Sequence, residues 1–452
     1  MVKLKGLSRD TLFIALGTVG NKVIVFLLVP FYTYFLTPAA YGQVDLLLLA
    51  VQVAVPLATL AYGDALLRFG IGASIKARQA QFSQGLYVIG TMLLLSSLPL
   101  LFLTGESFSL YALFVLLLVF QSSNLLIVQQ LKANQQLRLY ALNGLLFATI
   151  LLIVSIFFLA YVGWETNGVI LAQMIAYFLS SVVMLMAGRF KRFLRFQKPN
   201  SVLIKKMCVY ALPLIPNSIM WWVMQVSDRF VVSFYLGLGA TGLYAVATKI
   251  PSILSLVNTV FYQAWQLHAL KTKDLQTITR MFRYYSGFFI LVTSVLMAIT
   301  QPLVSLLFTA PFYDAWQYVP FLLIAVLFSS LASFLEIPYM IHKNTGRLLL
   351  TTIYGSVLNI ILTLTLIPLM GVNGAGLATL ISFMCTFILR ACKNNIFTQL
   401  PYRPSFFISL VLLMMQAAFL LYSSFGISVQ IAMIVAQLLV NRRLLLGFKT
   451  SR

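Results

Sequence analysis

The sequence predicts an all-α, polytopic membrane protein with about 14 transmembrane helices, and two observations carry this prediction. Hydrophobic residues make up 61% of the 452 residues and charged residues only 9%, which leaves too little polar surface to cover a water-soluble globule. Apolar runs of roughly 20 residues, the length that crosses a hydrocarbon core as a helix, recur along the whole chain. The chain is therefore expected to fold in lipid, without a soluble domain.

The expected spans follow from these apolar runs and the polar segments between them. We expect them at 11–36, 44–64, 85–104, 110–131, 143–162, 168–188, 210–236, 242–264, 284–308, 314–341, 348–368, 374–392, 404–424 and 427–446.

The lysines and arginines predict the orientation of these helices. With the N-terminus in the cytoplasm, all but three of the 31 basic residues fall in inner segments, while Glu106, Glu165 and Asp314 lie outside. This asymmetry follows the positive-inside rule and places both termini in the cytoplasm. The net charge of +22 therefore indicates contact with anionic membrane lipids, and no nucleic-acid partner is expected.

Two lobes and an appended helix pair are predicted from the longest inner loop and an internal repeat. The expected parts are an N-lobe of helices 1–6 (1–188), a basic cytoplasmic linker (189–206), a C-lobe of helices 7–12 (207–396), and helices 13–14 with a cytoplasmic tail (397–452). Two alignments relate equivalent helices of the lobes: Phe35, Leu36 and Gly42 with Tyr235, Leu236 and Gly242, and Asn167 and Gly168 with Asn373 and Gly374. Chance agreement is the alternative, since Leu, Gly and Ala are common in membrane chains. A genuine match predicts a parallel repeat, with a two-fold axis along the membrane normal and a cavity between the lobes.

Three basic residues are not assigned to the inner segments: Lys22, Arg229 and Lys249, which lie in the first, seventh and eighth predicted spans. A charge costs at least about 2.5 kcal/mol at the bilayer centre, so such residues usually pair or line a pathway. Lys22 lies near the middle of the first span without an acidic neighbour, which makes it the first candidate for a substrate-binding lumen. The structural alternative is that Lys22 pairs with an acid on another helix, such as Asp64 or Glu336, or snorkels to the inner surface.

Two structural ion pairs are predicted from spacing. Asp228 and Lys249 lie equally far from the turn at 237–240, so an antiparallel hairpin would set them at one level. This pair would leave Arg229 as the unbalanced cation of the C-lobe. Asp64 and Arg68 are four residues apart, the spacing of a salt bridge along one helix.

Polar side chains at helical spacing extend the candidate lumen. Asn217, Trp221 and Gln225 share a face of helix seven, and Tyr244 begins a similar stripe in helix eight. Such stripes either line a wet pathway or join membrane helices by hydrogen bonds.

No catalytic, metal or cofactor site is predicted. The three cysteines and two histidines, Cys208, Cys385, Cys392, His268 and His342, are isolated, without the spacing of metal ligands. The sequence lacks a Gly-x-x-x-x-Gly-Lys phosphate loop, so ATP is not expected as a direct fuel through that motif. The predicted outer loops are also too short for a membrane enzyme.

Several motifs together resemble the Wzx-type bacterial polysaccharide flippases, which belong to the multidrug, oligosaccharidyl-lipid and polysaccharide exporter superfamily. They are 20–42, 227–230, 235–237, 242–250 and 371–379. The resemblance implies two six-helix lobes and alternating access. The implied function is translocation of polyprenyl-pyrophosphate-linked oligosaccharides (O-antigen, capsule or exopolysaccharide units) from the cytoplasmic to the outer leaflet of the bacterial inner (plasma) membrane. A polysaccharide polymerase and chain-length machinery are implied partners.

Two alternatives stay open within this superfamily. The extra helix pair is similar to that of lipid II flippases, which keeps a peptidoglycan-precursor substrate possible. A cation-coupled drug exporter would want a carboxylate deep in the first helix, where this chain has Lys22.

Overall fold

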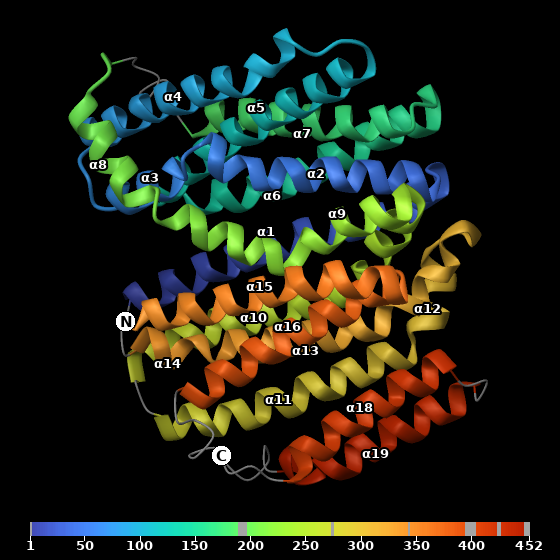
Figure 1. The fold of residues 1–452 in the computed structure, drawn as a ribbon. Helices are drawn as coiled ribbons and strands as arrows, with labels where there is room; N and C mark the ends of the chain where they lie inside the picture. Colours follow the sequence, from blue (N-terminus) through green and yellow to red (C-terminus); the bar gives the residue numbers. More distant parts are fainter. Residues whose placement is uncertain are drawn as a thin grey trace. The chain divides into compact units, whose positions relative to one another are not determined.

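The computed structural model describes residues 2–188, 197–272, 275–341, 344–393, 404–422 and 426–446, and the regular elements of these ranges are helices (Figure 1). Contacts divide the chain into two compact units. The first unit consists of Met1–Leu36 and Gln43–Ile219, and the second consists of Thr37–Gly42 and Met220–Arg452.

The first unit contains the N-terminal helices. They are α1 (Val2–Phe35), α2 (Pro38–Ala58), α3 (Tyr62–Gly70), α4 (Ile75–Ser97), the 3-10 turn η1 (Leu98–Leu101), α5 (Gly105–Ala133), α6 (Leu137–Ile156), the π-helical turn η2 (Phe157–Val162), α7 (Thr166–Ala187) and α8 (Ser201–Ala211).

The second unit contains the remaining helices, with α9 beginning in the first unit. They are α9 (Leu214–Ala247), α10 (Lys249–Thr272), α11 (Leu275–Ala298), α12 (Thr300–Leu307), the 3-10 helix η4 (Ala310–Tyr318), α13 (Val319–Phe334), α14 (Glu336–Ile341), α15 (Thr345–Met370), α16 (Val372–Lys393), α18 (Pro404–Tyr422) and α19 (Gly426–Leu446).

The described helices include the predicted membrane spans. Eleven helical segments are long and apolar enough to cross a membrane, and Val19–Phe35 and Ser428–Asn441 are two shorter apolar helices. One of the eleven, Ser201–Tyr262, is interrupted by the non-helical Gly237, and Arg229 donates to Thr248 from the other side of this break. This segment is therefore a hairpin of two spans. The described residues thus contain the 14 expected spans of a multi-pass membrane protein.

The predicted span 44–64 is not one straight helix. Leu60 and Ala61 have positive φ angles of 48° and 49°, which end α2 and begin the separate helix α3. A left-handed conformation costs an L-residue about 1–2 kcal/mol. The burial of the following residue, Tyr62, offsets this cost, because its hydroxyl donates to the Gln81 carbonyl at 3.0 Å and its ring is fully buried.

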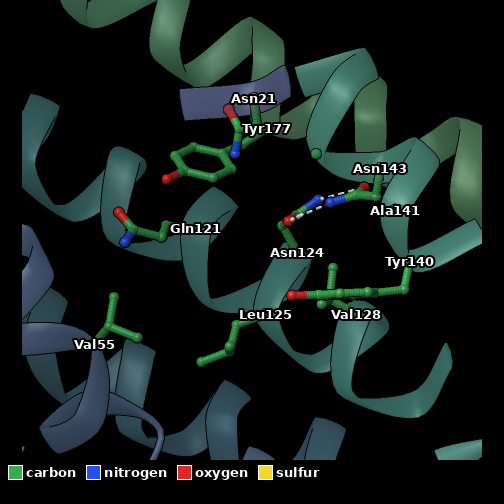
Figure 2. Close-up of a pocket in the computed structure, with 11 residues that line it drawn as sticks. Asn21, Val55, Gln121, Asn124, Leu125, Val128, Tyr140, Ala141, Asn143 and Tyr177 are labelled. Atoms are coloured by element: carbon green, nitrogen blue, oxygen red, sulfur yellow. Dashed lines mark hydrogen bonds between the residues drawn. The ribbon is translucent and has the colours of Figure 1, made fainter. Parts of the chain in front are cut away.

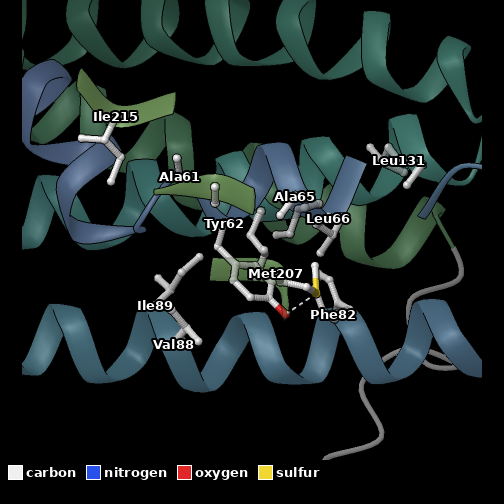
Figure 3. Close-up of a cluster of buried hydrophobic side chains, with 14 of the residues drawn as sticks. Ala61, Tyr62, Ala65, Leu66, Phe82, Val88, Ile89, Leu131, Met207 and Ile215 are labelled. Atoms are coloured by element: carbon white, nitrogen blue, oxygen red, sulfur yellow. Dashed lines mark hydrogen bonds between the residues drawn. The ribbon is translucent and has the colours of Figure 1, made fainter. Parts of the chain in front are cut away.

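Tyr62 lies in an apolar core formed by α3, α4, α5 and α8 (Figure 3). From α8, Met207 enters this core with its sulfur 3.0 Å from the Tyr62 hydroxyl oxygen. The backbone of Asn200, just before α8, donates to the Gln84 side chain at 2.9 Å. The described part of the expected linker, 197–206, is therefore packed on the first unit, and contacts divide the chain at Met220 instead. Residues 189–196 lie outside the described ranges.

The α18–α19 pair is joined to α11 by buried amides. Gln416 of α18 accepts from the Ser294 hydroxyl at 2.7 Å and donates to Gln430 of α19 at 3.0 Å. Gln437 and Asn441 of α19 donate to Ser409 of α18 at 2.7 and 2.9 Å. Polar side chains of this kind join helices within a membrane, where apolar burial adds little.

Candidate functional site

Lys22 lies in α1 with an exposed side chain, and it makes no hydrogen bond or ion pair with a residue that the structure describes. Val23 and Leu27, at 44% and 58% exposure, mark the open side of this helix. Lys22 is rotated by about 120° around the helix axis from the midpoint of Val23 and Leu27. It shares its own side of α1 with Val29 and Thr33, which are 5% and 2% exposed. Lys22 therefore projects on the side that protein covers two to three turns farther along α1.

Asn21, the residue before Lys22, lines a cavity of about 270 Å³ inside the first unit (Figure 2). The cavity walls come from α1, α2, α5, α6 and α7, and no lining residue is charged. Two lining amides, Asn124 and Asn143, bond reciprocally at 3.4 and 3.3 Å, and Asn124 also donates to Ser180 and Ser181. This amide pair joins α5, α6 and α7 and forms one fixed wall of the cavity.

Asp228, which the sequence pairs with Lys249, is held by other partners. Its carboxylate is 3% exposed and accepts from the Tyr244 hydroxyl at 2.5 Å, the Thr379 hydroxyl at 3.2 Å and the backbone N–H of Arg229 at 2.9 Å. The hairpin does bring the two helices to one level, as predicted. The prediction of Lys249 as the partner missed the adjacent helix α16, which supplies Thr379.

The remaining lumen candidates of the second unit separate into different environments. Tyr244 is fully buried as the donor to Asp228, and Arg229 donates to the Thr248 hydroxyl at 2.8 Å. Gln225 is exposed, and Lys249 is half-buried at the start of α10. The side chain of Asn217 lies outside the described residues. Gln225 is thus exposed while Tyr244 is buried, so these described candidates do not share one environment.

A buried ion pair in the second unit was not predicted. Arg390 of α16 is 0% exposed, and its Nη1 lies 2.9 Å from Glu336 Oε1 of α14. The guanidinium also donates to the Ala332 carbonyl and to the hydroxyls of Thr351 and Thr352 at 2.9, 3.1 and 3.0 Å.

On sequence, Arg390 counts among the basic residues of the inner segments because it lies near the end of an apolar run, and the structure buries its side chain near the end of α16. Four of its guanidinium hydrogens are used within the unit, and the ring of Trp221 lies 5.9 Å away. Trp221, a lumen candidate, thus contacts this pair. The sequence signal for this ion pair was an arginine preceded by a long apolar stretch, together with a glutamate near the end of another apolar stretch.

The predicted Asp64–Arg68 salt bridge does not form between these described residues. Asp64 instead accepts weakly from Gln129 at 3.5 Å, and both charged side chains of α3 are exposed. An exposed pair at this spacing contributes only about 0.3–0.5 kcal/mol, too little to hold two flexible side chains together. Among the described residues, Asp64 accepts from Gln129 and Glu336 pairs with Arg390, so neither is paired with Lys22. Snorkelling, the other structural alternative for Lys22, stays a prediction.

Within the described ranges, no group of three or more His, Cys, Asp or Glu side chains could hold a metal ion. The side chains of His268 and His342 lie outside those ranges. The three cysteines are free thiols.

Solved structures show what the fold is similar to. A lipid II flippase, MurJ, in an inward closed conformation matches 97% of this chain and 98% of its own, with a TM-score of 0.71 and 16% identity. An inward-facing multidrug resistance MATE family transporter of the MOP superfamily matches 84% of this chain and 96% of its own, with a TM-score of 0.61 and 12% identity. The MATE transporter VcmN of Vibrio cholerae matches 87% of this chain and 97% of its own, with a TM-score of 0.53 and 13% identity. At these identities the likeness shows the fold alone.

Sequence comparison gives the family. No curated protein sequence matches the chain. The sequence model of the polysaccharide biosynthesis protein family matches residues 7–266. This range includes most of α1, the residues that line the cavity of the first unit (the N-unit cavity), Asp228 and Arg229. The match covers more than half of the chain and agrees with the resemblance carried by the motifs in α1, α9 and α10. This multi-pass membrane protein therefore belongs to the polysaccharide biosynthesis protein family.

Proposed function

We propose that this chain is a flippase that moves polyprenyl-pyrophosphate-linked oligosaccharides from the cytoplasmic to the outer leaflet of a bacterial inner membrane by alternating access. The substrate would be an O-antigen, capsule or exopolysaccharide unit. Membership of the polysaccharide biosynthesis protein family and a fold shared with flippases and exporters support this proposal. Both termini would lie in the cytoplasm, the side of the membrane that carries the basic segments.

The single observation that carries the proposal is that the charge of Lys22 has no described partner. A pyrophosphate is a hydrated anion, and its passage through a low-dielectric interior requires a compensating cation. Asp228 and Glu336 are already held by partners inside the second unit, and so are Arg229 and Arg390. Lys22 has no described partner and projects on the covered side of α1. Its charge is thus available to a ligand.

A lipid II-type peptidoglycan precursor is the second candidate substrate. It carries the same kind of pyrophosphate, so Lys22 would bind either substrate. The match to a lipid II flippase along 97% of the chain supports this second candidate. A cation-coupled drug exporter is less supported, because the residues lining the N-unit cavity include no carboxylate to attract a cation.

The test measures translocation of a fluorescent polyprenyl-pyrophosphate oligosaccharide in proteoliposomes that contain the purified full chain. Lys22→Arg should retain part of the rate, whereas Lys22→Ala and Lys22→Glu should abolish it, because the charge meets the substrate. All three variants should insert at normal abundance, since Lys22 is not part of a packed ion pair. Full translocation by Lys22→Ala would contradict the proposal. Lipid II in the same liposomes distinguishes the two substrates.

A further inference from the structure

We propose that the N-unit cavity is a subsite for one uncharged sugar ring, lined by Asn21, Gln121 and Tyr140 beside the lysine that meets the pyrophosphate. This inference rests on the proposed function, because it names the part of the same substrate that the cavity would hold. Lys22 is close to the cavity because it directly follows Asn21, which lines the cavity, in α1. A ligand at Lys22 therefore lies beside the cavity wall.

Unused hydrogen-bonding groups point to a polar ligand. The Asn21 side-chain oxygen is buried and has no hydrogen-bond partner. Among the described residues, the Gln121 amide and the Tyr140 hydroxyl also have no hydrogen-bond partner, whereas the neighbouring Asn124 and Asn143 amides bond to each other. Figure 2 shows Gln121 on one side of the cavity and the Tyr140 hydroxyl on the other. Buried groups left without partners normally bind water or a ligand.

The chemistry of the lining selects an uncharged, hydroxyl-rich ligand. Amides and phenols offer both donors and acceptors, as sugar hydroxyls require, and the rings of Tyr140 and Tyr177 add apolar faces. No carboxylate lines the cavity. The ammonium of Lys132 lies 4.4 Å from the centre of the Tyr140 ring, and this positive charge disfavours a cationic drug.

The size of the cavity limits the ligand to a single ring. Its volume of about 270 Å³ lies just below the roughly 300–1,000 Å³ of pockets for drug-sized molecules. One sugar with its hydroxyls could displace the water from a space of this size. We therefore assign the cavity to the sugar nearest the pyrophosphate, the one within reach of both Lys22 and Asn21.

The experiment compares two probes on the full chain in lipid nanodiscs: a polyprenyl pyrophosphate that carries one hexose or N-acetylhexosamine, and the bare polyprenyl pyrophosphate. Wild-type protein should bind the glycosylated probe more tightly. Asn21→Leu and Gln121→Leu should each weaken its binding roughly tenfold, because each removes hydrogen bonds to the sugar. Binding of the bare probe should stay unchanged, whereas Lys22→Ala should weaken binding of both.

Two further variants separate binding from folding. Tyr140→Phe keeps the ring and its contact with Lys132 but removes the hydroxyl, and should weaken binding of the glycosylated probe several-fold. Gln301→Leu in α12, an amide of the other unit, is the matched control and should change neither probe. Thermal unfolding midpoints near that of the wild type would establish that the variants fold.

Three outcomes would overturn the subsite. They are equal binding of both probes by the wild type, equal weakening of both probes by Asn21→Leu, and unchanged binding in the folded Tyr140→Phe and Gln121→Leu variants. The first would mean that the cavity holds water only. Failure of the wild type to bind either probe would instead contradict the proposed function itself.

Discussion

At the scale of single residues, the buried charges of the second unit each lie in a set of hydrogen bonds that includes at least one other helix. Asp228 of α9 is bound by Tyr244 and Thr379, and Arg390 of α16 is bound by Glu336 of α14 and two threonines of α15. Such arrangements satisfy charges that lipid could not solvate. They leave Lys22 of the first unit as a contrasting cation, exposed and without a described partner.

The Arg390–Glu336 pair gives a prediction about stability. Arg390→Leu should lower the free energy of unfolding by about 3–5 kcal/mol, because it leaves the Glu336 carboxylate buried without its cation. The double variant Arg390→Leu/Glu336→Leu should recover part of this loss. The measurement is the thermal unfolding midpoint of the purified protein in detergent.

Arg280→Leu is the matched control for that prediction, since Arg280 of α11 is exposed. Its midpoint should stay close to that of the wild type. Equal midpoints for Arg390→Leu and Arg280→Leu would show that the buried pair is not a stabilising contact.

At the scale of elements, residues that the internal repeat aligns meet each other in the second unit. A methyl group at Gly42 would overlap the Leu238 carbonyl oxygen, and one at Gly242 would overlap the carbonyl oxygen of Pro38. An offset of 200 relates Gly42 to Gly242 and Pro38 to Leu238, so the two contacts are reciprocal. The parallel repeat of the two lobes stays a prediction.

Glycine at position 242 should therefore be required for this close approach. Gly242→Ala should lower the free energy of unfolding by about 1–3 kcal/mol, because the added methyl group forces the start of α2 away from the α9 hairpin. Gly239→Ala is the control, since no atom lies within 4 Å of a methyl group there. Thermal unfolding of the two variants provides the comparison, and similar midpoints would contradict the steric argument.

At the scale of the whole molecule, the positive-inside rule gives an orientation that the helix bounds make testable. The chain between Ala133 and Leu137 follows α5 and should face the cytoplasm, together with Asn200 before α8. Gly105 at the start of α5 and Gly163 after η2 should face the opposite side.

Reporter fusions measure this orientation. Fluorescent-protein fusions after Gln135 and Asn200 should be active, and alkaline phosphatase fusions after Gly105 and Gly163 should be active, because each reporter folds on one side of the membrane only. The single span α5 lies between the fusion points at Gly105 and Gln135. The same location for both reporters would therefore show that α5 does not cross the membrane. An outward location for Asn200 would reverse the proposed topology.

The sequence by itself determined the membrane class, the number of helices and the family, because apolar run length and local motifs are read along the chain. It also indicated the hairpin around Gly237, since a turn with glycines between apolar runs is a local signal. Tertiary structure alone decided which charges are satisfied. Thr379, which binds Asp228, and Glu336, which binds Arg390, come from helices far away in sequence, and spacing within one helix or hairpin does not predict them. The cavity beside Lys22 likewise exists only because five helices place their amides and phenols around one space.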